Sequence, residues 1–148
     1  THQVVGVAHE SLVANIGRAL RGLGVRRGAV VHGRSGVDEV VGDAPTLVYS
    51  FDEEEERLWE LDPSAFGVAA PLPTPLGGSV AACRDAFAEI LGGARGSASD
   101  VVALNAAVVF YVTGAHAQLR DAFEHARSIL HAGDAWRTFE RARAMARG

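Results

Sequence analysis

The sequence predicts an α/β fold with a mixed, partly parallel sheet and helices packed on it. Three observations indicate it: two β-branched runs that flank a helical stretch, two further runs joined by a short acidic segment, and a helical second half. At 148 residues, 48% of them hydrophobic, the chain is long enough for one core and too short for two. We therefore expect residues 1–148 to form a single α/β domain fragment.

A strand, a helix and a second strand occupy the beginning of the chain. Gln3 to Ala8 is apolar and β-branched, and Glu10 to Leu23 carries apolar residues at helical spacing before Gly24. Arg27 to Gly33 has consecutive apolar residues at its centre, which is typical of a strand covered on both faces. This order predicts a βαβ unit with two parallel strands.

Two further runs, Pro45 to Phe51 and Arg57 to Leu61, predict a hairpin, because only the acidic stretch Asp52 to Glu56 separates them. We interpret that stretch as a solvated turn. The alternative, a calcium loop, would require an Asp/Asn/Gly spacing that the stretch lacks. Asp62 to Gly78 contains most of the prolines, so we expect irregular structure there.

The remainder is expected to be helical. Ser97 followed by Asp100 resembles a capping box, and the helix that it would open is apolar nearly all round, so we expect the fold to enclose it. Asn105 in that helix needs a buried partner, and we favour a fold-specifying hydrogen bond over a contact with ligand. Cys83 is expected to be buried in a helix. The expected helices are Val80 to Leu91, Ser99 to Val112, Gln118 to His131 and Asp134 to Ala146.

Composition excludes some classes of function. The formal net charge is −4 and the 14 basic residues, all Arg, are scattered, so we do not expect nucleic acid as a partner. A single cysteine fits a reducing compartment, and a cytoplasmic location is expected. The most apolar stretch, Val101 to Ala117, is too short and too polar for a membrane span. Because the chain begins at Thr1 and its one Met is Met145, we expect a piece of a longer protein.

A loop with two adjacent carboxylates, Asp38 and Glu39, follows the second predicted strand. In open α/β sheets, ligands bind outside the carboxyl ends of the strands, where this loop must lie. Carboxylates in such a loop can bind Mg²⁺ when phosphate oxygens supply further ligands. Taken alone, the string favours a solvated acidic turn over a metal site. For the neighbouring His32, a structural hydrogen bond is favoured over contact with substrate.

The segment Val30 to Glu39, followed by Ala44 to Thr46, closely resembles a part of anthranilate phosphoribosyltransferases that contains Val-Val-His-Gly, Gly-Leu-Asp-Glu and Gly-Pro-Thr. The similarity covers essentially the whole chain, and it implies the C-terminal part of a phosphoribosyltransferase/nucleoside-phosphorylase-like α/β domain. The other similar positions, in family order, are Gln3 to Val7, Leu20 to Gly24, Phe66-Gly67, Gly77-Gly78, Leu104 to Ala107, Tyr111 and Gly114.

The resemblance implies a magnesium-dependent enzyme of tryptophan biosynthesis. Such an enzyme transfers the 5-phosphoribosyl group of phosphoribosyl pyrophosphate to the amino group of anthranilate, and Asp38 and Glu39 match its Mg²⁺ ligands. No catalytic residue is implied in this chain, and its substrate-binding residues are not assigned. The family's Gly-Thr-Gly-Gly-Asp and Lys-His-Gly-Asn motifs have no counterpart in it. Ser35, Val41 and Ala44 depart from the family pattern, where an Asp, a Ser or Thr, and a Gly are usual.

Phosphate and acceptor binding would therefore depend on a missing N-terminal half. We expect the chain alone to be inactive, and either to form a homo-oligomer or aggregate through the unpaired edge of its first strand, or to be a proteolytic remnant. Two alternatives from other classes stay open. One is a non-catalytic relative that binds nucleic acid, and the other is a structural or regulatory module that keeps the fold.

Overall fold

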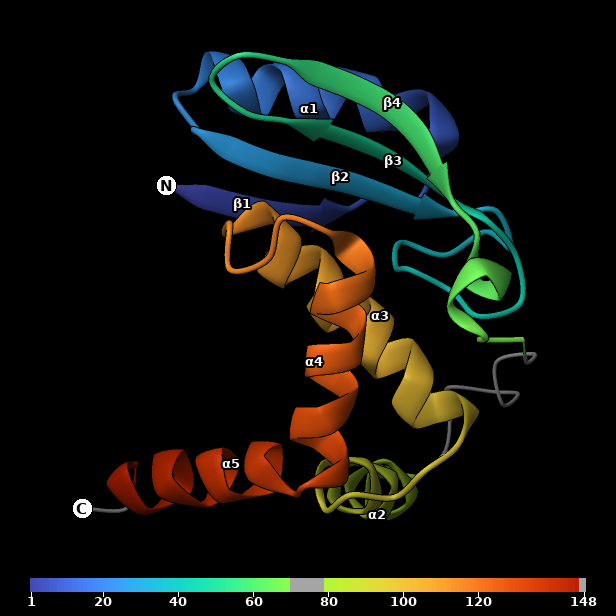
Figure 1. Ribbon diagram of the computed structural model, residues 1–148, viewed down its shortest axis with the longest axis vertical. Helices are drawn as coiled ribbons and strands as arrows, with labels where there is room; N and C mark the ends of the chain where they lie inside the picture. The colour runs from blue at the N-terminus through green and yellow to red at the C-terminus, as the bar shows by residue number, and fades with distance from the viewer. Residues whose placement is uncertain (70–78, 147–148) are drawn as a thin grey trace.

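A computed structural model describes residues 1–69 and 79–146. Within them a four-stranded sheet has the order β1-β2-β3-β4 (Figure 1). β1 and β2 pair in parallel, whereas β2 with β3 and β3 with β4 pair antiparallel. The mixed, partly parallel sheet predicted from the sequence is thus confirmed. The strands are β1 His2–Gly6, β2 Arg27–Gly33, β3 Thr46–Phe51 and β4 Glu56–Leu61.

Helices cover both faces of the sheet. α1 connects β1 to β2 and lies on one face, and the pair α3 and α4 meets the other (Figure 1). α2 and α5 lie at the far ends of α3 and α4, away from the sheet. The α-helices are α1 Val13–Gly22, α2 Val80–Leu91, α3 Ser97–Val112, α4 Leu119–His131 and α5 Asp134–Met145, and short 3₁₀ helices are Glu10–Leu12 and Pro63–Phe66.

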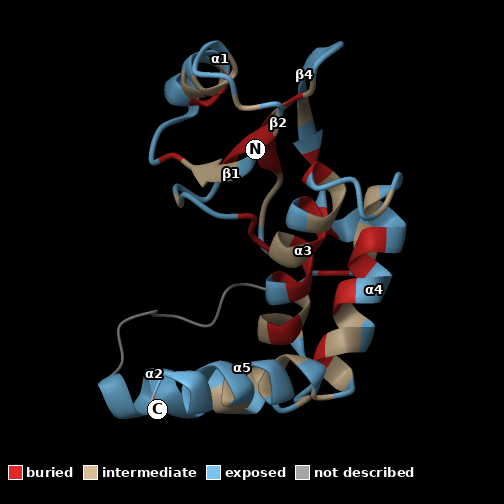
Figure 2. Cartoon of the chain, turned by 90° about the vertical axis from the view of Figure 1, so that its left-hand side faces the viewer, coloured by how far each residue is buried: buried red, intermediate tan, exposed pale blue. Residues whose placement is uncertain are grey.

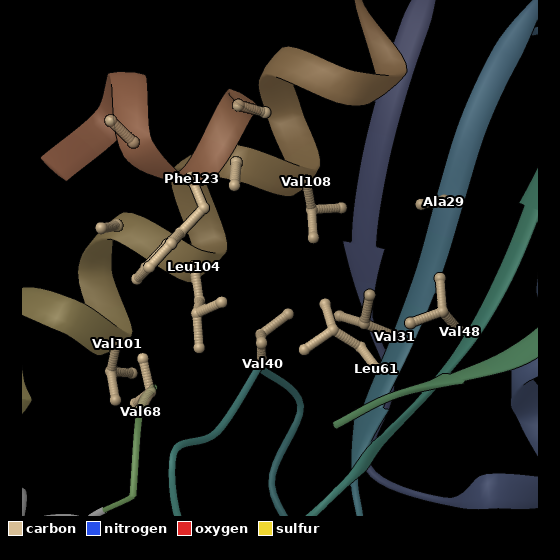
Figure 3. Packing of buried hydrophobic residues seen from close by; sticks show 14 of the residues in the cluster. Ala29, Val31, Val40, Val48, Leu61, Val68, Val101, Leu104, Val108 and Phe123 are labelled. Atoms are coloured by element: carbon tan, nitrogen blue, oxygen red, sulfur yellow. The ribbon is translucent and has the colours of Figure 1, made fainter. Parts of the chain in front are cut away.

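Alternation along β2 divides the core into two clusters. Ala29 and Val31 point into the cluster formed with α3 and α4, and Val30 points into the cluster formed with α1. Val30 is fully buried and Val31 is 3% exposed. The expectation of a strand covered on both faces is therefore confirmed, and Figure 3 shows Ala29 and Val31 on the side of β2 that faces the helices.

The acidic stretch between β3 and β4 is a hairpin turn, as predicted. Oδ1 of Asp52 accepts hydrogen bonds of 2.9 Å from the N–H groups of Glu54 and Glu55. These bonds, the one from Glu55 first, lower the pKa of the Asp52 carboxyl. Glu53 pairs with Arg26 at 2.6 Å, and Glu56 pairs with Arg21 at 3.2 Å. These carboxylates of the turn are thus occupied by backbone and arginine contacts, which favours the solvated turn over the calcium loop.

The predicted capping box at Ser97 is wrong. Gly96 is the N-cap of α3 and makes no side-chain cap bond, and Ser97 is already the first helical residue. With φ at 143°, Gly96 adopts a backbone conformation that is open to glycine. Asp100 instead forms an ion pair of 3.2 Å with Arg127 on α4. A cap that was not predicted occurs at α2, where Oγ of Ser79 accepts from the N–H of Ala82 at 3.2 Å.

Two expectations about burial are also wrong. Val102 and Val109 on α3 are 37% and 44% exposed, because α4 and the sheet cover the other sides of that helix. Cys83 is exposed, and α2 has no buried residue (Figure 2). α2 packs against α5 through Phe87 and Phe139. Gly77-Gly78 and most of the proline-rich stretch fall at 70–78, outside the described residues.

Candidate magnesium-binding loop

Residues 34–45 connect β2 to β3 and carry the acidic pair at the carboxyl end of β2. Since β1 runs parallel to β2, the carboxyl end of β1 lies at the same edge. Both Asp38 and Glu39 are exposed. In the part of the chain that the structure describes, neither carboxylate is hydrogen-bonded or ion-paired, so their oxygens are free to bind a ligand.

The loop begins with a tight turn. The N–H of Gly33 donates to the carbonyl of Val37 at 2.8 Å, and the N–H of Gly36 donates to the carbonyl of Gly33 at 2.8 Å. Gly36 has φ at 95°, in the left-handed region that favours glycine. The N–H of Arg34 donates to the carbonyl of Pro45 at 3.0 Å, which joins the two ends of the loop. The chain is thereby folded back so that the acidic pair lies beside the strand ends.

On one side the loop rests against the last residue of β1. A Cβ atom at Gly6 would lie 1.6 Å from the carbonyl oxygen of Asp38 and 2.7 Å from its carbonyl carbon. Only glycine allows the two backbones to approach so closely. No role was predicted for Gly6 from the sequence, although a glycine within a β-branched run is a signal of close backbone approach.

On the other side the loop enters the core. Val40 and Val41, which follow the acidic pair, are each 1% exposed. Figure 3 shows Val40 reaching from the loop into the space between α3 and the sheet. The side chain of Asn105 on α3 accepts from the N–H of Val40 at 3.1 Å and donates to its carbonyl at 2.8 Å. The predicted hydrogen bonding of Asn105 to a buried partner is confirmed, and Asn105 itself is half-buried. Oγ1 of Thr46 accepts from the N–H of Val41 at 3.2 Å.

His32 and Arg34 surround the start of the loop. Nδ1 of His32 lies 2.9 Å from the carbonyl oxygen of Val7, and the residue is 8% exposed, which supports the structural interpretation over substrate contact. Arg34 bonds to Glu60 through Nε at 2.6 Å and to Glu10 through Nη1 at 2.9 Å. The hydrogen bond to Glu60 and then the charge of Glu10 raise the pKa of the Arg34 guanidinium. Arg34 thus ties the start of the loop to β4 and to the 3₁₀ helix Glu10–Leu12.

The chemistry of the acidic pair suits a hard cation. Among residues 1–69 and 79–146, no group of three or more His, Cys, Asp or Glu side chains could hold a metal ion. Mg²⁺ is commonly bound by one or two carboxylates, with water and phosphate oxygens as its other ligands. Asp38 and Glu39 fit such a partial set of ligands. Of the departures from the resembled pattern, Ser35 is exposed, whereas Val41 is buried behind the pair.

A βαβ unit with an exposed acidic loop outside the carboxyl ends of its parallel strands defines the class of α/β domains that bind ligands at the sheet edge. Comparison with protein families agrees. Residues 1–136 match the glycosyl transferase family, a/b domain, and the chain belongs to this family. None of the helices that the structure describes is long and apolar enough to span a membrane.

Two curated relatives of this chain are anthranilate phosphoribosyltransferases. Anthranilate phosphoribosyltransferase of Methylobacterium radiotolerans is 36% identical over 141 residues, which are 95% of this chain and 41% of that protein. The enzyme of the same name from Thermosynechococcus vestitus is 39% identical over 140 residues, 92% of this chain and 41% of that protein. The chain therefore spans about two fifths of the length of these relatives.

Solved structures give the same fold. Anthranilate phosphoribosyltransferase from Thermus thermophilus superposes with a TM-score of 0.87 at 32% identity, covering 97% of this chain and 42% of that one. The Saccharomyces cerevisiae enzyme, in complex with PRPP and Mg, superposes with a TM-score of 0.79 at 23% identity, covering 95% of this chain and 41% of that one. The second likeness concerns the fold alone.

Proposed function

We propose that this chain is the C-terminal part of an anthranilate phosphoribosyltransferase and supplies the magnesium side of its active site. One observation carries the proposal: Asp38 and Glu39 are exposed, have no hydrogen-bonding or ion-pairing partner among residues 1–69 and 79–146, and lie in a loop at the carboxyl ends of two parallel strands. The similarity to anthranilate phosphoribosyltransferases supports it, as do the yeast enzyme structures with bound Mg and with PRPP and Mg.

In the proposed reaction the amino nitrogen of anthranilate forms a bond to C1 of the ribose. The bond from C1 to the pyrophosphate oxygen breaks, pyrophosphate leaves with the electron pair, and the amine loses a proton. Mg²⁺, when bound, stabilises the negative charge that develops on the leaving group. Asp38 and Glu39 would hold the cation at the sheet edge, next to Val40 and Val41, which are buried in the core.

The remaining parts of the site belong to the missing N-terminal half. Positioning of the sugar phosphate and the acceptor contributes much of the rate in such transfers, so the chain alone is inactive. In the whole protein, the missing half also covers the outer edge of β1. A cytoplasmic location fits a biosynthetic enzyme with one exposed cysteine.

The experiment uses the full-length protein that contains this chain. Anthranilate is fluorescent, so its consumption is followed directly in the presence of phosphoribosyl pyrophosphate and Mg²⁺. We expect turnover that stops when EDTA removes the cation and resumes when Mg²⁺ is restored. Absence of turnover with both substrates would reject the proposal. Filter binding of DNA and RNA at low and high salt, in the same preparation, tests the non-catalytic alternative.

A further inference from the structure

One side chain outside the loop contacts the backbone immediately behind the acidic pair. Asn105 is on α3, 65 residues along the chain from Val40, yet its amide both accepts from and donates to the backbone of Val40. Its Nδ2 group also donates to the carbonyl of Val101 at 3.0 Å, one turn back on its own helix. This bond within α3 fixes the orientation of the Asn105 side chain, which also bonds to the loop.

The two hydrogen bonds satisfy both the N–H and the carbonyl of Val40, as a neighbouring strand would. A carboxamide carries a donor and an acceptor side by side, so it can satisfy the N–H and the carbonyl of one residue together. Aspartate offers no comparable donor when ionised, and alanine offers neither group. Val40 is 1% exposed, so water cannot replace the lost partners easily.

The position of the acidic pair follows from its two neighbours. Asp38 is held at its carbonyl by close contact with Gly6 on β1, and Val40 is held by Asn105. Glu39 lies between these two fixed points. A change on either side shifts the carboxylates relative to the sheet edge, where any bound phosphate must meet the cation.

We infer that Asn105 is a positioning residue for the Asp38–Glu39 magnesium site: its carboxamide fixes the peptide of Val40 and thereby the direction of both carboxylates. The inference rests on the proposed function of the loop. Asn105 itself touches neither substrate nor metal in this role. Loss of the groups that orient metal ligands typically weakens metal binding by about 10–100-fold.

The test measures cation binding directly, with Mn²⁺ as a paramagnetic probe followed by electron paramagnetic resonance in the full-length protein. The variants are Asn105→Ala, which removes both groups, and Asn105→Asp, which keeps the size and an acceptor but loses the donor. Val112→Ala is the matched control, because Val112 is 3% exposed on the same helix but borders Arg27 and Phe51 at the opposite end of the sheet. Thermal unfolding shows which variants are folded.

We expect the Mn²⁺ dissociation constant to rise about 10–100-fold in both Asn105 variants and to stay within about twofold of the parent value in Val112→Ala. The Mg²⁺ concentration for half-maximal turnover should rise in parallel. Hydrogen exchange at the Val40 amide should quicken in Asn105→Ala, which loses the acceptor of that N–H, and not in Val112→Ala. Unchanged Mn²⁺ binding in folded Asn105→Asp would overturn the inference while leaving the proposed function intact. Absence of any cation binding in the unsubstituted protein would instead overturn the proposed function, and the inference with it.

Discussion

The carbonyl oxygen of Asp38 lies so close to Gly6 that a Cβ atom at Gly6 would be 1.6 Å from it. The last residue of β1 and the first acidic residue of the loop are therefore in backbone contact, although they are far apart in the chain. This contact holds the loop on the side that faces β1, opposite the side where Val40 and Val41 enter the core. Gly6 is thus part of the support of the candidate site.

Gly6→Ala should force β1 and the loop apart. Overpacking of this kind typically costs about 1–3 kcal/mol of the free energy of unfolding, and backbone atoms cannot give way as side chains do. Gly22→Ala is the matched control, because nothing lies within 4 Å of its new Cβ and it ends α1. We expect that control to gain up to about 1 kcal/mol. Urea unfolding measures both, and equal stability of the two variants would show that the loop does not contact β1.

The hairpin turn predicts a dependence of stability on pH. Hydrogen bonds from Glu55 and Glu54 lower the pKa of Asp52 in the folded chain, so its charged form contributes stability above the pKa of the unfolded chain. That contribution is lost as the pH falls through the folded pKa. Asp52→Asn should therefore unfold more easily than the parent chain near pH 7, and the difference should shrink below about pH 4. A difference that grows on acidification would contradict the assignment.

The outer edge of β1 predicts the behaviour of the 148-residue chain on its own. The N–H of Val7 donates to the carbonyl of Val31, and the carbonyl of Thr1 accepts from Arg26. The backbone polar groups of odd-numbered residues along β1 therefore face β2, and the N–H of His2 faces the open edge. We expect concentration-dependent association in sedimentation experiments and no consumption of phosphoribosyl pyrophosphate with anthranilate and Mg²⁺. His2→Pro removes an outward donor and should weaken the association. A clean, active monomer would contradict both expectations.

Much of the fold could be predicted from local patterns. Period-2 and period-3.6 apolar spacing located the strands and helices, and Gly133, in the left-handed conformation, separates α4 from α5. Exposure could not be predicted in the same way. The apolar content of α3 predicted that the fold encloses this helix, yet Val109 is exposed. Which side of a helix is covered depends on the packing of other elements, and the sequence of that helix does not specify it.

Part of the candidate site could be predicted from local sequence, and part could not. Asp38 and Glu39 could be singled out because carboxylates after a strand are a local signal, and their role stays a prediction. The supports of the loop are not local. Asn105 was expected to need a partner, but nothing in a single sequence indicates that the partner is Val40.

The capping box predicted at Ser97 was wrong because α3 begins after Gly96, which makes no side-chain cap bond.

The most direct test of the magnesium site replaces the charges of the acidic pair while keeping its size, as Asp38→Asn with Glu39→Gln in the full-length protein. Asp43→Asn is the matched control, an exposed acid of the same loop that lies beyond the pair. We predict that kcat/KM for phosphoribosyl pyrophosphate falls about 10²–10³-fold in the double variant, that Mn²⁺ binding is lost, and that the control keeps both. Unchanged Mg²⁺-dependent turnover in the folded double variant would contradict the claim that this loop holds the cation.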